Sequence, residues 1–361
     1  MIIKKAVFKN FRNIKELDIT PHSKMNIIYG ENGQGKTNVL EGLWLFSGAK
    51  SFRGAKDKEM VMFGEQGSLL NMDFFEKGTE KSAKITILEK RQAEFLGKKL
   101  QRPSLLAENF HAVVFSPSDL ALIDGSPEKR RRFLDLAIGQ IAPKYIEILR
   151  DYNRAILQRN ALLKKLSEDK TNEELLTPFE IKASESAEKI LKYRYKYVEL
   201  LNKEAPKLYS GISEEKEILK IEYVSKFKKE TTKEEIQTAF LNRRKIDILA
   251  KTTTIGPKKD DLNILINEKE AKTFGSQGQR RSAALCLKLA EAEIMKGVTK
   301  EEPVAFLDDV MSELDTKRQN YILNKLLNKQ VFITCCDKDN FQQIKDGFVF
   351  KMEDGKICSS I

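Results

Sequence analysis

The sequence contains few residues of the kinds that bind structural metals or cross-link a chain. Its 361 residues include only four cysteines and two histidines. No two cysteines form a C-x-x-C pair, and with only His22 and His111 to add, a zinc site is not expected. The four thiols are expected to be reduced, as is usual in the cytoplasm.

Long apolar runs are absent as well. No stretch approaches the roughly 20 apolar residues that a bilayer-spanning helix needs. Residues 1–8 carry charge within their apolar stretch, which is not typical of a signal peptide. We therefore expect a cytoplasmic protein with no membrane partner. The length allows two domains, or one large domain with an insertion, and 41% hydrophobic residues are enough to bury a core.

Negative charge is in deficit, since 64 Lys and Arg outnumber 53 Asp and Glu, for a net charge of +11. This excess favours a polyanionic partner. The cations gather in five clusters: Lys98-Lys99 with Arg102, Lys129 to Arg132, Lys226 with Lys228-Lys229, Arg243-Arg244-Lys245, and Lys258-Lys259. Each cluster alone is more typical of a solvated surface, and four consecutive cations cannot all face one ligand on a helix. Together they indicate contacts with a nucleic-acid backbone, with little sequence specificity and a steep dependence on salt.

A glycine-rich segment near the amino terminus is the most informative feature that is present. The octet is Gly30-Glu31-Asn32-Gly33-Gln34-Gly35-Lys36-Thr37, and it fits the phosphate-binding pattern G-x-x-x-x-G-K-S/T without a mismatch. The preceding residues 25–29 predict a buried strand, and residues 37–46 predict a helix, which is the context that this pattern requires. Backbone N–H groups at a helix start can then surround a phosphate chain, and the glycines permit its close approach. The lysine would supply charge to the outer phosphates, and the threonine hydroxyl would hold Mg²⁺.

A second glycine-rich turn, residues 274–279, precedes a long predicted helix at 278–296. It resembles the loop that contacts the far side of the nucleotide in ABC-type ATPases. Ser276 can be a simple helix N-cap. Alternatively, its hydroxyl and the helix start face a γ-phosphate. The position of the turn, shortly before an apolar strand that ends in two aspartates, favours the second interpretation.

Those two aspartates follow the apolar run 304–307. A carboxylate from Asp308 can bind Mg²⁺ through water, opposite Thr37. Asp309 can orient or deprotonate the attacking water. The alternative is that an aspartate here only caps the next loop, but beside a phosphate loop the catalytic interpretation is favoured.

The hydrophobic pattern predicts an α/β protein with three parts along the chain. Residues 1–120 would form the amino-terminal part of an ATPase domain, residues 121–250 a mainly α-helical lobe, and residues 251–361 the rest of the ATPase domain. Strands are predicted at 2–8, 17–20, 25–29, 69–75, 83–88, 112–115, 216–227, 262–266, 304–307 and 331–334. Further helices are predicted at 128–140, 144–167, 173–204, 234–249 and 315–327.

Combined, these motifs resemble the RecF family, which is related to the SMC proteins, over nearly the whole length. Besides the two glycine-rich turns, the matching segments are Phe8–Asn13, Val114–Leu120, Gly125–Asp135 and Phe306–Asp315. The resemblance implies an ABC-type ATPase head with mixed and antiparallel β-sheets and an inserted α-helical lobe. It also implies a weak, DNA-stimulated ATPase in DNA repair, replication, recombination and the SOS response. Such proteins dimerise when ATP is bound, bind DNA at single-strand gaps, and act with RecR and RecO to load RecA.

The resemblance also implies roles for individual residues. Arg12 would reach the nucleotide held by Gly30 to Thr37. Lys36, Asp309 and Ser276 would act in hydrolysis. Ser276 and Gln279 would complete the nucleotide site of the other protomer. Residues 312–315 would lie at the dimer seam.

Three departures from the family pattern are visible. ABC heads usually have Glu where this chain has Asp309, and often His after the strand where it has Thr334-Cys335-Cys336. We therefore expect slow hydrolysis that times the release of an ATP-held clamp. The third departure is Gly256 to Asp261, where His-Arg would be expected before the paired aspartates.

Three alternatives remain: an SMC-like DNA-tethering ATPase, the ATPase subunit of a transporter, and a nuclease fused to an ATPase. The first needs longer coiled coils, and the second does not predict the basic clusters. The nuclease would need a separate set of metal-binding carboxylates, and only Asp260-Asp261 is found outside the core, where a turn or helix cap explains it as well.

Overall fold

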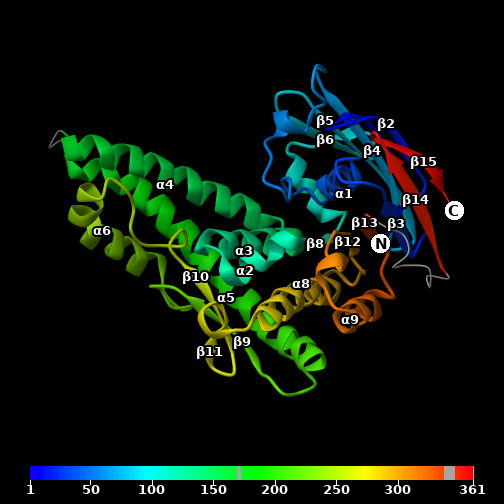
Figure 1. Ribbon diagram of the computed structural model, residues 1–361. Coiled ribbons are helices and arrows are strands. Elements are labelled where there is room, and N and C mark those ends of the chain that lie inside the picture. Colours follow the sequence, from blue (N-terminus) through cyan, green and yellow to red (C-terminus); the bar gives the residue numbers. More distant parts are fainter. Residues whose placement is uncertain (169–171, 337–345, 361) are drawn as a thin grey trace. The chain divides into compact units, whose positions relative to one another are not determined.

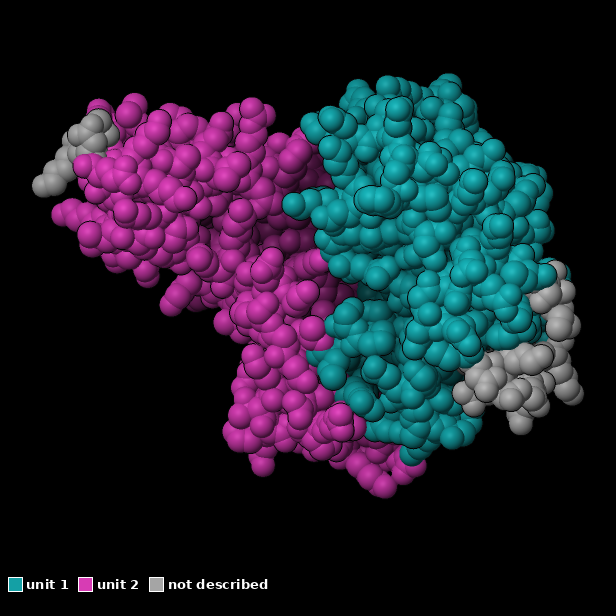
Figure 2. Space-filling view, turned by 45° about the horizontal axis from the view of Figure 1, so that its top comes forward, with its two compact units in different colours: residues 1–120, 281–361 teal, residues 121–280 magenta. Residues whose placement is uncertain are grey.

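The computed structural model describes residues 1–168, 172–336 and 346–360 (Figure 1). The chain divides into two compact units (Figure 2). The head unit comprises residues 1–120 and 281–361, and the inserted unit comprises residues 121–280. In the part of the chain that the structure describes, no helix has the length and apolar character needed to cross a membrane.

A six-stranded sheet is the centre of the head unit, with strand order β15-β14-β3-β13-β12-β8. Its strands are β3 (Met25–Tyr29), β8 (Ala112–Phe115), β12 (Val304–Asp308), β13 (Val331–Cys335), β14 (Gly347–Glu353) and β15 (Lys356–Ser360). All neighbours pair in parallel except β14 and β15. Strands β8, β12 and β13 are buried along their whole length, which explains their continuous apolar sequences.

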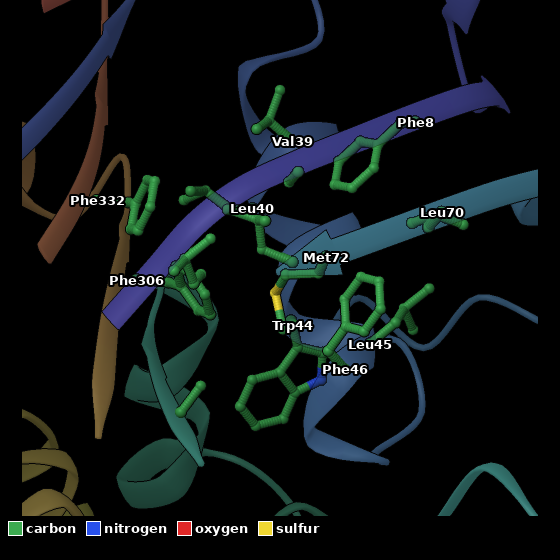
Figure 3. Packing of buried hydrophobic residues seen from close by; sticks show 14 of the residues in the cluster. Phe8, Val39, Leu40, Trp44, Leu45, Phe46, Leu70, Met72, Phe306 and Phe332 are labelled. Atoms are coloured by element: carbon green, nitrogen blue, oxygen red, sulfur yellow. The ribbon is translucent and has the colours of Figure 1, made fainter. Parts of the chain in front are cut away.

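A second, antiparallel sheet has the order β2-β1-β4-β5-β6-β7. Its strands are β1 (Ile2–Phe11), β2 (Ile14–Ile19), β4 (Ser68–Glu76), β5 (Thr79–Ile87), β6 (Arg91–Phe95) and β7 (Lys98–Lys99). Helix α1 (Lys36–Trp44) contributes to the same apolar cluster as both sheets. Phe8 and Met72 from the antiparallel sheet, Leu40 from α1, and Phe306 and Phe332 from the central sheet belong to this core (Figure 3).

The remaining regular elements of the head unit are helical. They are α8 (Gln277–Thr299), which begins just before the unit boundary, α9 (Thr316–Leu326), and the 3₁₀ turns at Leu45–Ser47, Asp57–Met60, Pro103–Glu108, Pro117–Leu120 and Met311–Glu313.

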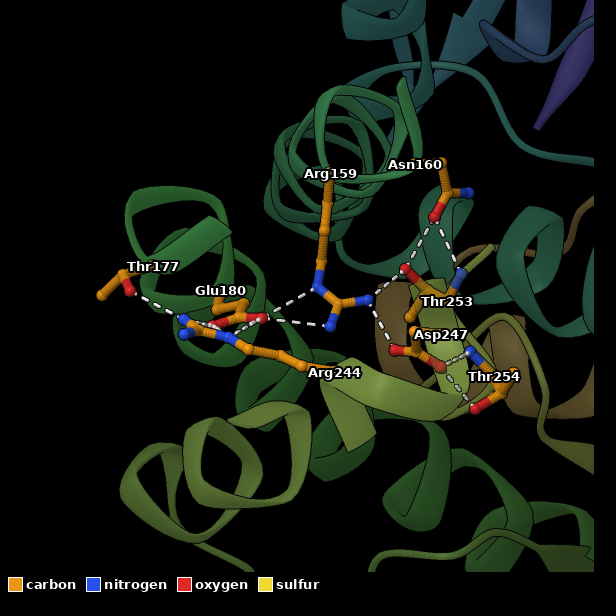
Figure 4. Close-up of polar contacts among 8 residues, drawn as sticks. All are labelled: Arg159, Asn160, Thr177, Glu180, Arg244, Asp247, Thr253 and Thr254. Carbon is orange, nitrogen blue, oxygen red and sulfur yellow. Dashed lines mark hydrogen bonds and ion pairs between the residues drawn. The ribbon is translucent and has the colours of Figure 1, made fainter. Parts of the chain in front are cut away.

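The inserted unit combines helices with a small sheet of order β11-β10-β9. Its elements are α2 (Ala121–Asp124), α3 (Pro127–Ile141), α4 (Lys144–Glu168), α5 (Thr177–Ser213, after a 3₁₀ turn at Glu173–Leu176), β9 (Leu219–Val224), α6 (Lys233–Leu249), β10 (Asp261–Ile266), β11 (Lys269–Glu270) and α7 (Ala271–Phe274). Contacts between α4, α5 and α6 bury an ionic network (Figure 4). In it, the Arg159 guanidinium lies between the carboxylates of Glu180 and Asp247, at 3.0 and 2.6 Å.

The boundary predicted at residue 250 differs from the one that the structure gives. Residues 251–280 lie in the inserted unit, although the sequence assigned them to the ATPase domain. The reason is strand pairing, because β10 runs antiparallel to β9 over six residue pairs, from Asp261 with Val224 to Ile266 with Leu219. Two strands predicted for different domains thus form one sheet.

Helix α5 is longer than the predicted 173–204. It continues through Pro206 to Ser213, although proline cannot donate the bond to the carbonyl four residues earlier. The side chain of that earlier residue, Asn202, bonds with both the backbone N–H and the carbonyl of Ile221 on β9, at 2.9 and 2.6 Å. Packing against β9 therefore stabilises the helix across the proline. The strands β6, β7, β11, β14 and β15 were not predicted.

Candidate nucleotide-binding site

The loop between β3 and α1 has a backbone that only glycine adopts readily. Gly30, Gly33 and Gly35 have φ of 151°, 84° and 108°. A Cβ on Gly30 would lie 2.3 Å from the carbonyl oxygen of Met352, and one on Gly35 would lie 2.6 Å from the Asn13 side chain. The glycines are therefore required by the loop itself, and they leave its N–H groups uncovered by side chains.

The Lys36 side chain folds back over this loop and is only 4% exposed. Its Nζ donates to the carbonyl oxygens of Gly30 at 2.6 Å and Glu31 at 2.9 Å. Both acceptors are neutral, so they solvate the ammonium group without cancelling its charge. An anion in the loop would meet a positive charge that is already held in place.

The turn between β14 and β15 supports the loop from one side. Gln34 accepts a 2.6 Å bond from the Asp354 N–H with its side-chain oxygen and a 3.0 Å bond from the Gly355 N–H with its carbonyl oxygen. On another side, the Asn13 side chain donates to the Gly33 carbonyl oxygen at 3.2 Å. The predicted nucleotide contact Gln34 therefore also braces the loop. The Asp-Gly pair was the sequence signal for this turn, since it favours tight hairpins.

Asn32 is another member of the predicted octet, and its side chain contacts the end of β13. Its Oδ1 lies 3.2 Å from the Cys336 thiol. No sequence pattern predicts this contact.

Thr37 and Asp308 lie together, as the motifs predicted. Asp308 ends β12, which is separated from β3 by β13 alone, so both residues lie at the carboxyl edge of the sheet. The Thr37 hydroxyl donates to Asp308 Oδ1 at 2.7 Å. Burial raises the pKa of the Asp308 carboxyl above its usual value, although hydrogen bonds from Thr37 and Thr334 oppose the increase.

Asp309 has a left-handed backbone, with φ of 52°. Such a conformation is uncommon outside glycine, although aspartate tolerates it better than most residues. Its N–H donates to the Thr334 hydroxyl at 3.0 Å, and its carbonyl oxygen accepts from the Ser312 hydroxyl at 2.8 Å. In the sequence, Thr334 is notable only because the family pattern has a histidine after this strand.

The oxygens at this edge suit Mg²⁺ if phosphate and water complete the coordination. Among residues 1–168, 172–336 and 346–360, no group of three or more His, Cys, Asp or Glu side chains could hold a metal. Thr37 and Asp308 provide a hydroxyl and a carboxylate. Mg²⁺ commonly binds proteins through one or two such groups and takes its other ligands from substrate phosphates and water.

Arg12 forms an ion pair with α1. Its Nε and Nη2 donate to the two carboxylate oxygens of Glu41, each at 2.9 Å, and Nη1 donates to the Glu59 carbonyl oxygen at 2.8 Å. Glu41 is fully buried and also accepts a hydrogen bond from Ser51. This pair gives Arg12 a structural function besides any contact with a nucleotide. The acidic residue within the otherwise uncharged second half of α1, residues 39–44, was the sequence signal that was missed.

Ser276 and Gln279 lie in the inserted unit and form a reciprocal cap at the start of α8. The Gln279 side chain accepts from the Ser276 N–H at 2.7 Å, and the Ser276 hydroxyl accepts from the Gln279 N–H at 3.2 Å. The Gln279 amide also donates to Glu217 at 2.6 Å. The simple N-cap role is therefore present, and Ser276 remains exposed.

The fold and this site define a phosphate-loop nucleotide-binding protein with an α/β head. The family described as "RecF/RecN/SMC N terminal domain" matches residues 2–358. The DNA replication and repair protein RecF of Bacillus cereus is 36% identical over 372 residues, which cover 100% of this chain and 99% of the relative. A solved RecF–ATP structure from the RecFOR pathway, also 36% identical, has a TM-score of 0.91 and covers 100% of this chain and 97% of that chain. The Smc head domain of Pyrococcus furiosus, 14% identical with a TM-score of 0.56 and coverages of 100% and 96%, shares the fold.

The chain therefore belongs to the RecF family of DNA replication and repair proteins. The match to RecF covers the full length of this chain, which favours the RecF family over an SMC-like tether or a transporter subunit.

Proposed function

We propose that the protein is an ATP-dependent DNA-binding recombination mediator. It acts at single-strand gaps, dimerises when ATP is bound, hydrolyses ATP slowly, and assists RecA loading together with RecO and RecR. The observation that carries this proposal is the convergence of Lys36, Thr37 and Asp308 at one edge of the central sheet. The 36% identical RecF whose structure is described with ATP supports the choice of nucleotide.

Within this site, the Gly30–Thr37 loop binds the phosphates through its N–H groups, and the Lys36 ammonium group, which two carbonyl oxygens hold in place, supplies a positive charge to them. Thr37 and Asp308 hold Mg²⁺, which when bound neutralises charge on the phosphates. Asp309 orients the attacking water. Its side chain is one methylene shorter than the usual glutamate, so it reaches the water less well and hydrolysis is slow.

Dimerisation requires a second contact with the same nucleotide. Ser276 is exposed at the start of α8, where the positive end of the helix dipole and a hydroxyl suit a γ-phosphate. In the proposed dimer, Ser276 and Gln279 of each protomer complete the site of the other, and residues 312–315 lie at the seam.

The basic clusters differ in their availability for DNA. Arg130 forms a bidentate ion pair with Asp261 at 2.7 and 2.8 Å, and Arg244 pairs with Glu180. These two arginines stabilise the inserted unit. The exposed lysines are candidates for phosphate contacts, and they are Lys98, Lys99, Lys129, Lys226, Lys228, Lys245, Lys258 and Lys259. Replacing a contacting lysine should weaken binding to all DNA sequences and reduce the salt slope by about 1.

Sedimentation with and without ATP and Mg²⁺ tests the proposal for the wild type and Lys36→Arg. The wild type should change from monomer to dimer on addition of ATP, and the variant should do so weakly or not at all. Arginine keeps the charge, but its larger planar guanidinium crowds the loop that binds the phosphates. A wild type whose mass is unchanged at saturating ATP would contradict the proposed clamp.

DNA binding is measured in parallel, by titrating a gapped duplex at several salt concentrations. The logarithm of affinity should fall steeply with the logarithm of salt. A flat plot would argue against backbone contacts.

A further inference from the structure

Thr334 lies near the end of β13, which stands between the phosphate-loop strand β3 and strand β12; β12 ends in Asp308 and is followed by Asp309. We propose that Thr334 is a positioning residue that holds both Asp308 and Asp309 in their working geometry. The inference rests on the proposed ATPase function and assigns a further residue to it. Thr334 is fully buried, so it acts through the aspartates rather than on the nucleotide.

The Thr334 hydroxyl connects the two acidic residues directly. It donates its single proton to Asp308 Oδ1 at 3.0 Å and accepts the N–H of Asp309 at 3.0 Å. A hydroxyl can do both at once, because it has one donor and two acceptor sites. A valine of similar shape can do neither.

At Asp308, Thr334 provides a second hydrogen bond to the oxygen that also accepts from Thr37. Mg²⁺ would compete for the bond from Thr37. Oδ1 accepts from Thr37 on α1 and from Thr334 on β13. The Thr37 hydroxyl is also the proposed Mg²⁺ ligand, so its geometry must adapt when the metal binds. Thr334 is not a ligand, and its bond can keep the carboxylate orientation unchanged between the empty and loaded site.

At Asp309, Thr334 stabilises a strained backbone. Outside glycine, left-handed φ values are uncommon, and a hydrogen bond from the residue's own N–H helps to hold one in place. The bond from the Asp309 N–H to Thr334 is such a constraint, and it lies at the first residue after the strand. Since the backbone angles of Asp309 set the direction of its Cβ, Thr334 also determines where the carboxylate can reach.

The test compares Thr334→Val with Thr334→Ser, which restores the hydroxyl. Thr253→Val is the matched control, because Thr253 is a buried threonine of the inserted unit whose hydroxyl also donates once and accepts once, to Asn160 and from Arg159. For each variant we would measure ATP affinity without metal, the Mg²⁺ concentration for half-maximal hydrolysis, kcat and thermal unfolding.

Thr334→Val should bind metal-free ATP with an affinity within about twofold of the wild type. It should need several times more Mg²⁺ for half-maximal hydrolysis, and its kcat should fall about tenfold or more. Both losses are expected when a charge-assisted hydrogen bond that orients a catalytic group is removed. Thr334→Ser should recover most of both quantities. Thr253→Val should lower the unfolding temperature while leaving the Mg²⁺ requirement and kcat unchanged.

Hydrolysis and Mg²⁺ dependence equal to wild type in Thr334→Val would overturn the inference, as would a serine variant that fails to recover them. A wild type with neither Mg²⁺-dependent ATP binding nor turnover would instead overturn the proposed function, and the inference with it.

Discussion

The Thr37 hydroxyl donates a 2.7 Å hydrogen bond to Asp308 across a separation of 271 residues in the sequence. The bond joins the first turn of α1 to the end of β12, and it links the two residues proposed to hold Mg²⁺. Asp308 is 8% exposed and its pKa is raised by burial. Burial therefore disfavours the negative charge of the Asp308 carboxylate unless a cation binds to it.

Replacing Asp308 by Asn should therefore have opposite effects on stability and activity. Because the folded-state pKa is raised, the wild type loses stability as the pH rises through that pKa, and the variant does not. At neutral pH without metal, Asp308→Asn should unfold at a higher temperature than the wild type. Its Mg²⁺-dependent ATP hydrolysis should be at least about 100-fold slower, since a metal ligand is lost. A variant that is both less stable and equally active would contradict this assignment.

Ser276→Ala separates capping from nucleotide contact. Loss of the cap should cost about 1 kcal/mol of unfolding free energy. If Ser276 also completes the partner's site, ATP-driven dimerisation should be lost as well. Thr232→Ala is the matched control, because Thr232 and Glu235 form the same type of cap on α6. Sedimentation should show dimers for the control but not for Ser276→Ala, and dimers in both would restrict Ser276 to its capping role.

Arg12→Ala should destabilise the head unit by about 3 kcal/mol, because removing one partner leaves the buried Glu41 charge without its main counterion. Glu41→Gln added to Arg12→Ala should restore much of this loss in chemical denaturation. The double variant then reports on the nucleotide contact alone. ATP affinity that stays low in the stable double variant would support that contact, and wild-type affinity would exclude it.

Asp119 should make the stability of the head unit depend on pH. Burial raises the pKa of its carboxyl to about 6, against the opposing effects of Lys288 and of the Ser116 N–H, which donates to it at 2.7 Å. The neutral form is favoured on folding, so the wild type loses stability as the pH rises from about 4 through about 6. Asp119→Asn keeps an acceptor for Ser116 and avoids this loss.

The unfolding free energy of Asp119→Asn minus that of the wild type should therefore grow as the pH rises from about 4 through about 6, to at most about 3 kcal/mol. Above about pH 7 this difference should stay constant. Because the Asp119 residue is partly exposed, solvent should reduce the difference. Denaturant unfolding at pH 4, 5, 6 and 7 measures it. A difference that is constant across the four values would show that the carboxyl titrates normally.

Much of the site could be predicted from the sequence because its motifs are local. The glycines of the loop follow from backbone angles that only glycine tolerates. The pairing of Thr37 with Asp308 follows from two apolar strands, one of which leads into the loop before Thr37 while the other ends in Asp308. The same locality limits the prediction. Glu41, Thr334 and Asp354 contribute to the site through contacts with residues far along the chain, which no spacing rule describes.

The sequence alone determined the phosphate loop, the aspartate pair and the family, because each depends on residue types at fixed short spacings. The tertiary structure decided which elements share a sheet. It placed 251–280 in the inserted unit through the pairing of β10 with β9, and it placed Thr334 between the two aspartates through the order of β12 and β13. Strand order and register result from the packing of side chains over the whole core, so they cannot be obtained from any single segment.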